Sequence, residues 1–199
     1  MKQAVTNLAG ILLAAGGATR FGSPKVLARY RGEPLIRHGV RLLAPRCGAG
    51  VFVVVGAAAD SARTLLDGEP ATLVENPDWA QGMSTSIARG IASLPATADA
   101  ALILLGDQPA ITNTDLDALI DGWHVEPALI AAAGFNGQLG PPVIMPREYW
   151  PQLAALHGDQ GARSLLGWHA ERTTVPIPNA AYDVDTPEDL AWLEARPAQ

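Results

Sequence analysis

The chain has 199 residues, of which 48% are hydrophobic and 17% charged, a composition typical of one folded domain. Its 20 acidic residues outnumber its 14 basic residues, so we expect no nucleic-acid partner, because sequence-independent binding requires a basic face. The single cysteine, Cys47, excludes an intramolecular disulfide and fits a reducing cytoplasm, the location we expect. No apolar run reaches the ~18 residues that cross a bilayer, so no membrane partner is expected.

Short apolar runs alternate with helix-like segments along the chain. The runs are too short for buried helices and are bounded by Gly, Asp or Pro, which predicts strands at residues 11–15, 51–55, 101–105, 129–133 and 143–145. Helices are predicted at residues 34–44, 84–94 and 113–123, and after residue 186. Continuous apolar runs indicate strands covered on both faces. The sequence therefore predicts one domain over residues 1–199, an α/β three-layer sandwich with a mostly parallel central sheet.

Two of these helices carry clear start signals. Thr112 or Asn113 is expected to cap the helix over residues 113–123. In "DVDTPEDLAWLEA", Thr186 is the expected cap, Pro187 occupies the first helical position, and Asp189 follows three residues after the cap.

A glycine loop, "AAGGATRFGSPK", follows the first predicted strand. Residues 17–22 satisfy G-x-x-x-x-G, but residues 23–25 read Ser-Pro-Lys, so the P-loop pattern fails. Gly16 and Gly17 permit close backbone approach, and Arg20 and Lys25 supply positive charge. The loop is therefore either a phosphate-binding loop or a surface loop with two solvated cations.

Carboxylates occur at two other predicted turns. Asp107 follows the apolar run in "ALILLGDQPAIT", where it can bind Mg²⁺ or act as a turn former or helix cap. Asp183 and Asp185 lie two apart on an extended segment and should point to opposite faces. Only one of them is thus expected to share a metal with Asp107.

These motifs resemble the nucleotidyltransferases related to the molybdenum cofactor enzymes, the MobA-like guanylyltransferases and MocA-like cytidylyltransferases. "LAAGGATRFGSPK" is similar to their L-A-A-G-x-S-x-R-[MF]-G-x-x-K signature, although Ala18 replaces the usual serine and removes a hydroxyl donor. The resemblance covers residues 12–190 and implies a Rossmann-like nucleotidyltransferase fold. It implies that the loop wraps the nucleoside triphosphate through Leu13, Ala14, Ala15, Gly16, Gly17, Arg20 and Lys25.

The resemblance also assigns the metal. "GDQP" is similar to the family's metal-binding stretch and "DVDTPED" to its closing motif, which implies Mg²⁺ held by Asp107 and Asp185, with Asp183 in a supporting role. Arg20, Lys25 and Asp107 are the implied catalytic residues.

Two further stretches concern the base and the acceptor. "NPDWAQGMSTSI" looks like the MocA-type G-[ML]-x-x-S-[LI] motif, which favours CTP over GTP and implies base contacts from Gln81, Gly82 and Ser84; capping of a helix by Ser84 or Thr85 is the alternative. "GPPVIMP" and "LHGDQGARSLL" match acceptor-side motifs and imply contacts to a pterin from Gly140, Pro142 and Arg163, although the prolines can be purely structural.

The predicted function is Mg²⁺-dependent transfer of CMP from CTP to molybdopterin with release of pyrophosphate. The metal and the cations would offset the repulsion between the reacting phosphates. A receiving molybdoenzyme is a further expected partner. The alternatives are the same chemistry with GTP or another phosphorylated acceptor, such as a sugar phosphate, and a non-catalytic protein that binds and delivers the molybdenum cofactor. The five tryptophans are expected to pack in the core or against helices, and the four histidines to be structural or surface residues.

Overall fold

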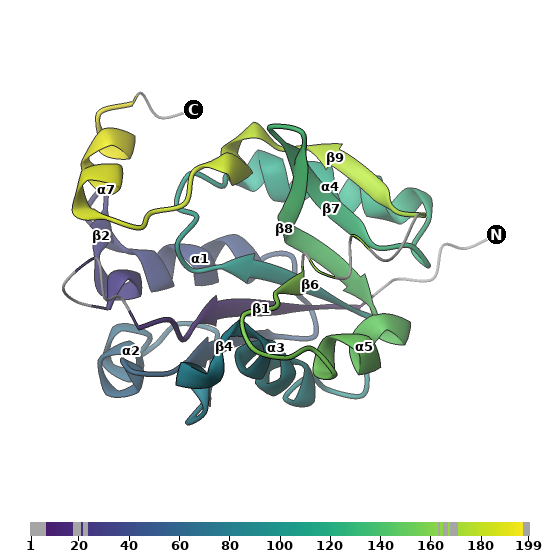
Figure 1. The fold of residues 1–199 in the computed structure, drawn as a ribbon, viewed down its shortest axis with the longest axis horizontal. Coiled ribbons are helices and arrows are strands. Elements are labelled where there is room, and N and C mark those ends of the chain that lie inside the picture. Colours follow the sequence, from purple (N-terminus) through teal and green to yellow (C-terminus); the bar gives the residue numbers. More distant parts are fainter. Residues whose placement is uncertain are drawn as a thin grey trace.

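A seven-stranded sheet forms the centre of the molecule (Figure 1). The structure is a computed structural model that describes residues 7–17, 21, 24–162, 164, 167 and 171–196. The strand order is β5-β4-β1-β6-β8-β7-β9. The strands are β1 (Leu8–Ala14), β4 (Val51–Val55), β5 (Thr72–Glu75), β6 (Ala100–Leu105), β7 (Ala131–Phe135), β8 (Gln138–Pro146) and β9 (Thr173–Pro176). Only β8 pairs antiparallel within this sheet, so the predicted mostly parallel sheet is confirmed.

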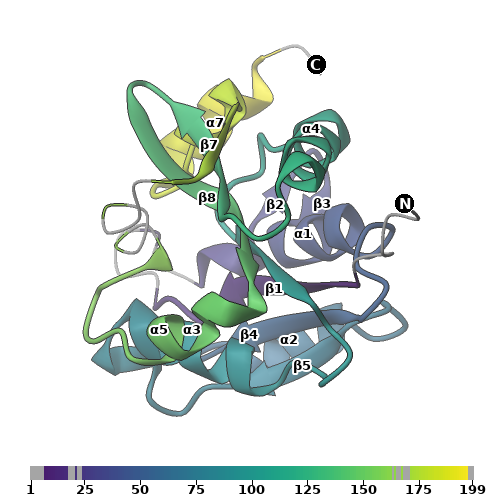
Figure 2. The same ribbon diagram turned by 90° about the vertical axis from the view of Figure 1, so that its right-hand side faces the viewer.

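Helices cover both faces of the sheet (Figure 2). The covering helices are α1 (Leu35–Leu43), α2 (Ala59–Leu65), α3 (Met83–Ala92), α4 (Asn113–Val125) and α5 (Trp150–Ala154); a further helix, α7 (Pro187–Glu194), belongs to neither hydrophobic cluster on the sheet. One hydrophobic cluster joins α1, α2 and α4 to one face, and a second joins α3 and α5 to the other. Leu12 of β1 belongs to the first cluster and Ile11 to the second, as the two-residue alternation of a strand requires. Burial on both faces explains the continuous apolar runs.

The predicted elements differ from the structure mainly toward the C-terminal half. The strands expected at residues 129–133 and 143–145 are found at Ala131–Phe135 and Gln138–Pro146. β8 is longer than its apolar run because it pairs with β6 on one side and β7 on the other. The short strands β5 and β9 lie at the two edges, where partly exposed residues give a weak apolar pattern. A small hairpin, β2 (Arg29–Tyr30) and β3 (Glu33–Pro34), precedes α1.

The helix starts largely follow their local signals. Thr112 caps α4 and Thr186 caps α7, each in a capping box with the acidic residue three positions later. Helix α3 begins at Met83 after Gly82, and no side chain caps it. Capping of α3 by Ser84 or Thr85 is therefore not observed.

The tryptophans divide between core and surface. Trp123 and Trp150 are buried, whereas Trp192 is 54% exposed and packs beside the Tyr182 ring. Trp168 lies outside the described residues. Among the helices that the structure describes, none is long and apolar enough to cross a membrane.

Candidate active site

Lys25 lies between two carboxylates from distant parts of the chain. Its Nζ atom is 2.6 Å from Oδ2 of Asp107 and 2.8 Å from Oδ1 of Asp185. Lys25 opens a short 3₁₀ helix after the glycine loop, Asp107 follows the end of β6, and Asp185 precedes α7. The fold thus brings together Lys25 of the predicted nucleotide loop and the two carboxylates that the resemblance implied as metal ligands.

Backbone contacts bring the C-terminal carboxylate to this place. The amide of Val184 donates a hydrogen bond to the carbonyl of Asp107 at 2.8 Å, which docks the segment against the end of β6. The Asp189 carboxylate of the α7 capping box accepts from the amides of Asp185 and Thr186 at 3.0 and 2.8 Å. The helix cap therefore fixes the backbone from which the Asp185 side chain reaches Lys25.

The charges in this cluster perturb one another. Partial burial lowers the pKa of Lys25, but the Asp107 and Asp185 carboxylates outweigh it and hold the pKa above its ordinary value. The lysine is therefore positively charged at neutral pH. Restricted hydration and the neighbouring Asp107 carboxylate raise the pKa of Asp183, partly offset by a hydrogen bond from Gln108.

A cavity of about 370 Å³ opens beside Lys25 and Asp107 at the carboxyl ends of the parallel strands. We call it the loop cavity. The residues that line it are Leu13, Ala14, Ala15, Gly16, Gly17, Lys25, Trp79, Ala80, Gly82, Met83, Ser86, Leu105, Asp107 and Asp159. Most of the predicted nucleotide-binding residues thus line one cavity.

Trp79 shapes this cavity, a role that the sequence did not reveal. A Cβ atom on Gly17 would lie 2.6 Å from Cζ3 of Trp79, and one on Gly56 would lie 2.5 Å from its Cγ. The indole therefore needs a glycine at both positions, one after β1 and one after β4. The glycines that follow the two apolar runs indicated that something packs closely there, but they did not identify Trp79 as the side chain that does so.

Some predicted residues lie away from the cavity. The side-chain amide of Gln81 donates a hydrogen bond to Oδ1 of Asp78 at 3.0 Å. Ser84 is buried, and its backbone amide donates to the carbonyl of Gly158. Gly82 lines the cavity and has φ +116°, and a Cβ there would lie 2.3 Å from the Gly158 carbonyl. Arg20 and Arg163, together with Ala18, fall outside the described residues.

A second cavity of about 440 Å³, the acceptor-side cavity, adjoins the loop cavity. Met83, Leu105 and Asp159 line both, so the two spaces share a wall. Gly140, one of the residues predicted to contact the acceptor, lines this second cavity, but its proline neighbour there is Pro141, while Pro142 is buried. Asp183 also faces this cavity, whereas Asp185 meets Lys25. The two carboxylates therefore serve different sides of the cluster.

The carboxylates at Lys25 have the chemistry of a site for a hard divalent cation. Oδ1 of Asp107 is buried and has no hydrogen-bond partner in the described part of the chain. Asp185 is 57% exposed, so its oxygens can be reached from solvent. Within the described ranges, no group of three or more His, Cys, Asp or Glu side chains forms a metal site. A divalent cation held by these two carboxylates would take its remaining oxygen ligands from outside the described residues.

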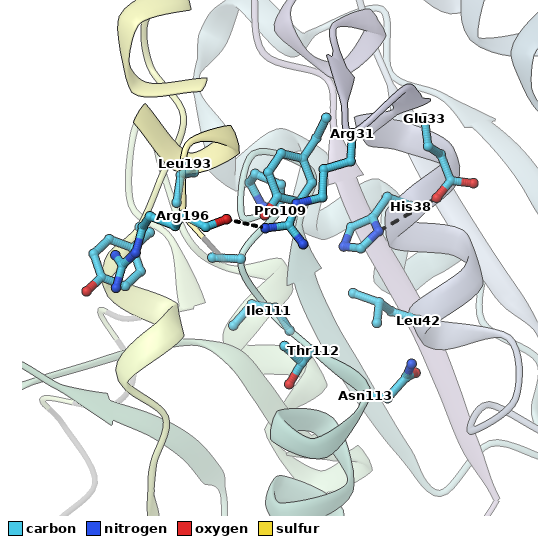
Figure 3. Close-up of a pocket in the computed structure, with 13 residues that line it drawn as sticks. Arg31, Glu33, His38, Leu42, Pro109, Ile111, Thr112, Asn113, Leu193 and Arg196 are labelled. Atoms are coloured by element: carbon cyan, nitrogen blue, oxygen red, sulfur yellow. Dashed lines mark hydrogen bonds and ion pairs between the residues drawn. The ribbon is translucent and has the colours of Figure 1, made fainter. Parts of the chain in front are cut away.

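Residues 109–113 line a third cavity, also about 370 Å³ (Figure 3). We call it the hairpin cavity, because Tyr30, Arg31 and Glu33 of the β2–β3 hairpin line it together with His38 of α1 and Arg196. Arg31 donates to the carbonyl of Arg196 at 2.8 Å, which ties the hairpin to the end of α7.

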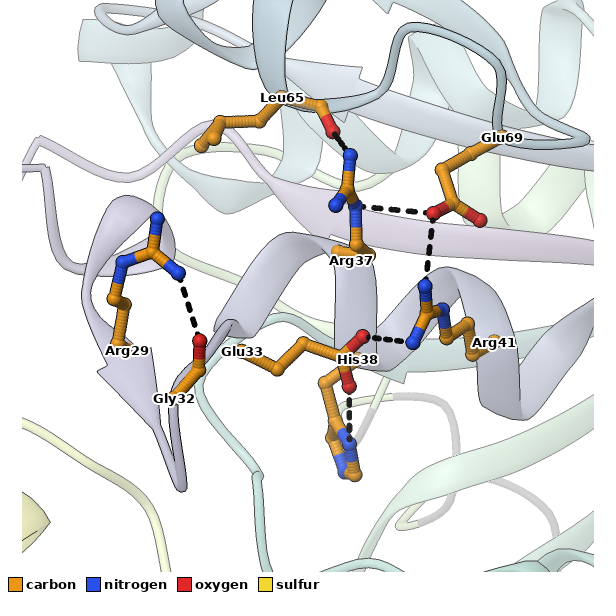
Figure 4. A network of polar contacts seen from close by, with 8 residues as sticks. All are labelled: Arg29, Gly32, Glu33, Arg37, His38, Arg41, Leu65 and Glu69. Atoms are coloured by element: carbon orange, nitrogen blue, oxygen red, sulfur yellow. Dashed lines mark hydrogen bonds and ion pairs between the residues drawn. The ribbon is translucent and has the colours of Figure 1, made fainter.

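A polar network extends from the hairpin cavity over α1 (Figure 4). Arg41 pairs with Glu33 at 2.6 Å, and Arg37 pairs with Glu69 at 3.0 Å. Burial lowers the pKa of His38 despite the nearby Glu33 carboxylate, so the imidazole is mainly neutral at pH 7. These contacts give His38 a structural setting.

The comparisons with known proteins agree with this geometry. Residues 10–173 match the MobA-like NTP transferase domain. The protein named nicotine blue oxidoreductase from Paenarthrobacter nicotinovorans is 30% identical over 196 residues, which covers 92% of this chain and 95% of that protein. A probable molybdenum cofactor guanylyltransferase from Synechococcus elongatus is 29% identical over 201 residues, covering 94% of this chain and 98% of the relative.

The fold also matches solved structures over almost the whole chain. The crystal structure of Rv0371c from Mycobacterium tuberculosis H37Rv matches with a TM-score of 0.78 and 28% identity, covering 96% of this chain and all of that one. The same protein has been solved in complex with manganese, and nucleotidyltransferases of this type typically use a divalent metal. The chain belongs to the MobA-like NTP transferase family and is a nucleotidyltransferase.

Proposed function

We propose that this enzyme transfers CMP from CTP to the terminal phosphate of molybdopterin and releases pyrophosphate. The observation that carries the proposal is Lys25, held by Asp107 and Asp185 at the edge of a cavity built by a glycine loop. The relative named as a probable molybdenum cofactor guanylyltransferase supports the acceptor class.

The reaction needs charge neutralisation and alignment more than covalent catalysis. An oxygen of the acceptor phosphate forms a bond to the α-phosphorus of the triphosphate. The bond from that phosphorus to the oxygen leading to the β-phosphorus breaks, and pyrophosphate leaves with the electron pair. In this chain, Gly16 and Gly17 allow the backbone to approach the triphosphate, and the Lys25 ammonium offsets its negative charge.

Asp107 and Asp185 would hold Mg²⁺. The ion would supply positive charge at the phosphate oxygens, where negative charge develops. Arg20, which follows Gly17 in the same loop, is proposed to add a second side-chain cation.

Substrate selection is assigned to the walls of the two adjoining cavities. Gly82 and the neighbouring start of α3 are proposed to face the base. Gln81 and Ser84 would reach the base after a local rearrangement. Gly140, Pro142 and Arg163 are proposed for the acceptor side, where the acceptor-side cavity adjoins the loop cavity through Met83 and Asp159. Cytosine follows from the motif resemblance, and GTP is the alternative triphosphate.

The test is an assay of purified protein with Mg²⁺, molybdopterin and each of the four ribonucleoside triphosphates. Pyrophosphate and the dinucleotide product are measured separately. CTP-dependent formation of both products supports the proposal, and GTP dependence replaces cytosine by guanine. Pyrophosphate release that does not depend on molybdopterin indicates another phosphorylated acceptor, such as a sugar phosphate.

A second arm separates the enzyme from a carrier that delivers the cofactor to a molybdoenzyme. Asp107→Asn should abolish most turnover, whereas Asp117→Asn, which alters an exposed carboxylate paired with Arg46, should not. If the unaltered protein and Asp117→Asn both bind the dinucleotide cofactor but neither forms it, the protein is a carrier.

A further inference from the structure

We infer that Lys25 occupies the place between the two carboxylates that a divalent metal requires, so that metal binds well only when a triphosphate draws the lysine away. The inference rests on the proposed function and names how the same site is regulated. Metal and nucleotide then bind cooperatively, with Lys25 as the coupling element.

The Lys25 ammonium contacts both carboxylates at once. A single Nζ atom contacts Oδ2 of Asp107 at 2.6 Å and Oδ1 of Asp185 at 2.8 Å. Both distances are those of charge-assisted hydrogen bonds. The Lys25 side chain is only 18% exposed, so solvent replaces these contacts poorly. The ammonium is therefore held as the resident counter-ion of the pair.

Competition with a metal follows from this position. A divalent ion that joined the same two oxygens would meet the ammonium at close range, where like charges repel strongly in a partly enclosed site. Oδ1 of Asp107 is left without a partner, but it is one oxygen, and the described residues offer no third acidic or histidine ligand. Without nucleotide, a metal must therefore displace Lys25 or bind weakly.

A triphosphate changes this balance because Lys25 also lines the loop cavity. An ammonium group has three donors and binds phosphate as a point charge, so phosphate oxygens can replace the carboxylates as its partners. Once Lys25 turns to the phosphates, Asp107 and Asp185 are free for the metal, and the phosphates provide further oxygen ligands. Linkage requires the reverse effect as well: metal must raise nucleotide affinity by the same factor.

The test measures Mn²⁺ binding by the loss of the free-ion signal in electron paramagnetic resonance. The full-length protein and Lys25→Met are titrated with Mn²⁺ alone and then with saturating CTP. Without CTP, Lys25→Met should bind Mn²⁺ about tenfold more tightly than the unaltered protein, within the usual range of coupling. CTP should raise Mn²⁺ affinity strongly in the unaltered protein and less in the variant.

Arg63→Met is the matched control. Arg63 is an exposed cation that contacts two carboxylates, Asp60 and Glu75, away from the loop cavity. Its loss changes net charge by the same amount and should leave Mn²⁺ affinity unchanged. Thermal unfolding and circular dichroism verify that both variants are folded.

Two results would overturn the inference: nucleotide-free Mn²⁺ affinity that is equal or weaker in Lys25→Met, or an equal gain in Arg63→Met. Neither result affects whether CMP transfer occurs, because that is measured separately as dinucleotide formation. Failure of the coupling and failure of the proposed reaction are therefore distinguishable. If CTP does not bind, GTP is used in the same titration.

Discussion

The loop cavity and the hairpin cavity have nearly the same volume, about 370 Å³ each, yet their charges are arranged differently. In the loop cavity one ammonium joins two carboxylates, and an oxygen of Asp107 remains without a partner. In the hairpin cavity the guanidinium of Arg196 lies 4.5 Å from the centre of the Tyr182 ring, and Arg31 is bonded to a backbone carbonyl.

We propose that this difference separates a reaction site from a packing gap. The hairpin cavity uses its cations to hold the β2–β3 hairpin and the end of α7 together. The loop cavity concentrates opposite charges at the ends of parallel strands, with room beside them for a ligand. The arrangement of charge, and not the volume, therefore supports the proposal that catalysis occurs in the loop cavity. Four variants test that distinction, in descending order of their predicted effects.

Asp107→Asn should have the largest effect. The amide keeps the size of the side chain but removes a negative charge from the Lys25 cluster and a metal ligand from the proposed site. We expect nucleotidyl transfer to fall about 100- to 1000-fold, the scale of a lost electrostatic contact to a transition state. Pyrophosphate release measures it. A decrease below tenfold would show that the chemistry lies elsewhere.

Gly17→Ala should come next, because the new Cβ would lie within 2.7 Å of the Trp79 ring. The glycine loop must then shift, and a displacement of about 1 Å can cost about 100-fold in rate. The value of kcat/KM should decrease by about 10- to 100-fold. Trp79→Phe in the same chain removes part of the clash and should recover some of the loss; no recovery would show that the contact does not set the loop.

Arg196→Ala should affect stability alone. It removes the guanidinium from the Tyr182 ring, which lines the hairpin cavity, and from the Trp192 ring, at a cost of about 0.5–1 kcal/mol in the free energy of unfolding. Urea unfolding measures this change, while pyrophosphate release should be unaltered. A large loss of activity would assign a functional role to the hairpin cavity and contradict the distinction drawn between the two cavities.

Asp183→Asn should produce the smallest effect, and one that depends on pH. The folded protein raises the pKa of Asp183, so it binds that proton more tightly than the unfolded chain. Stability from this group is therefore lost as pH rises from the ordinary pKa through the raised one. The asparagine variant should be slightly more stable than the unaltered protein at about pH 7, with the gap closing below about pH 4. Urea midpoints across this range check the sign, and a gap that widens in acid would refute it.

Much of the fold was predictable because its signals are local. Apolar runs predicted β1, β4 and β6. Thr112 and Thr186 predicted the starts of α4 and α7, each from a capping signal that spans only four residues. Edge strands β5 and β9 were not predicted, because one-sided burial leaves no continuous apolar run.

The site was predictable only in part. Motifs pointed to Lys25, Asp107 and Asp185, but they did not show that one ammonium bridges two carboxylates. Nor did they show that Trp79 packs against Gly17 and Gly56. Such contacts depend on how separate turns meet in space, and side-chain periodicity carries no information about that.

The docking of Val184 on the Asp107 carbonyl has a consequence for biosynthesis. Translation proceeds from the N-terminus, and early segments can fold while later ones are still being added. Strands β1, β4 and β6 can thus assemble on the ribosome with Lys25 and Asp107 in place, but Asp185 is still missing. The nascent chain gains Asp185 only after β7, β8 and β9 have been synthesised, so a fragment released before that point would carry Lys25 and Asp107 without their third partner.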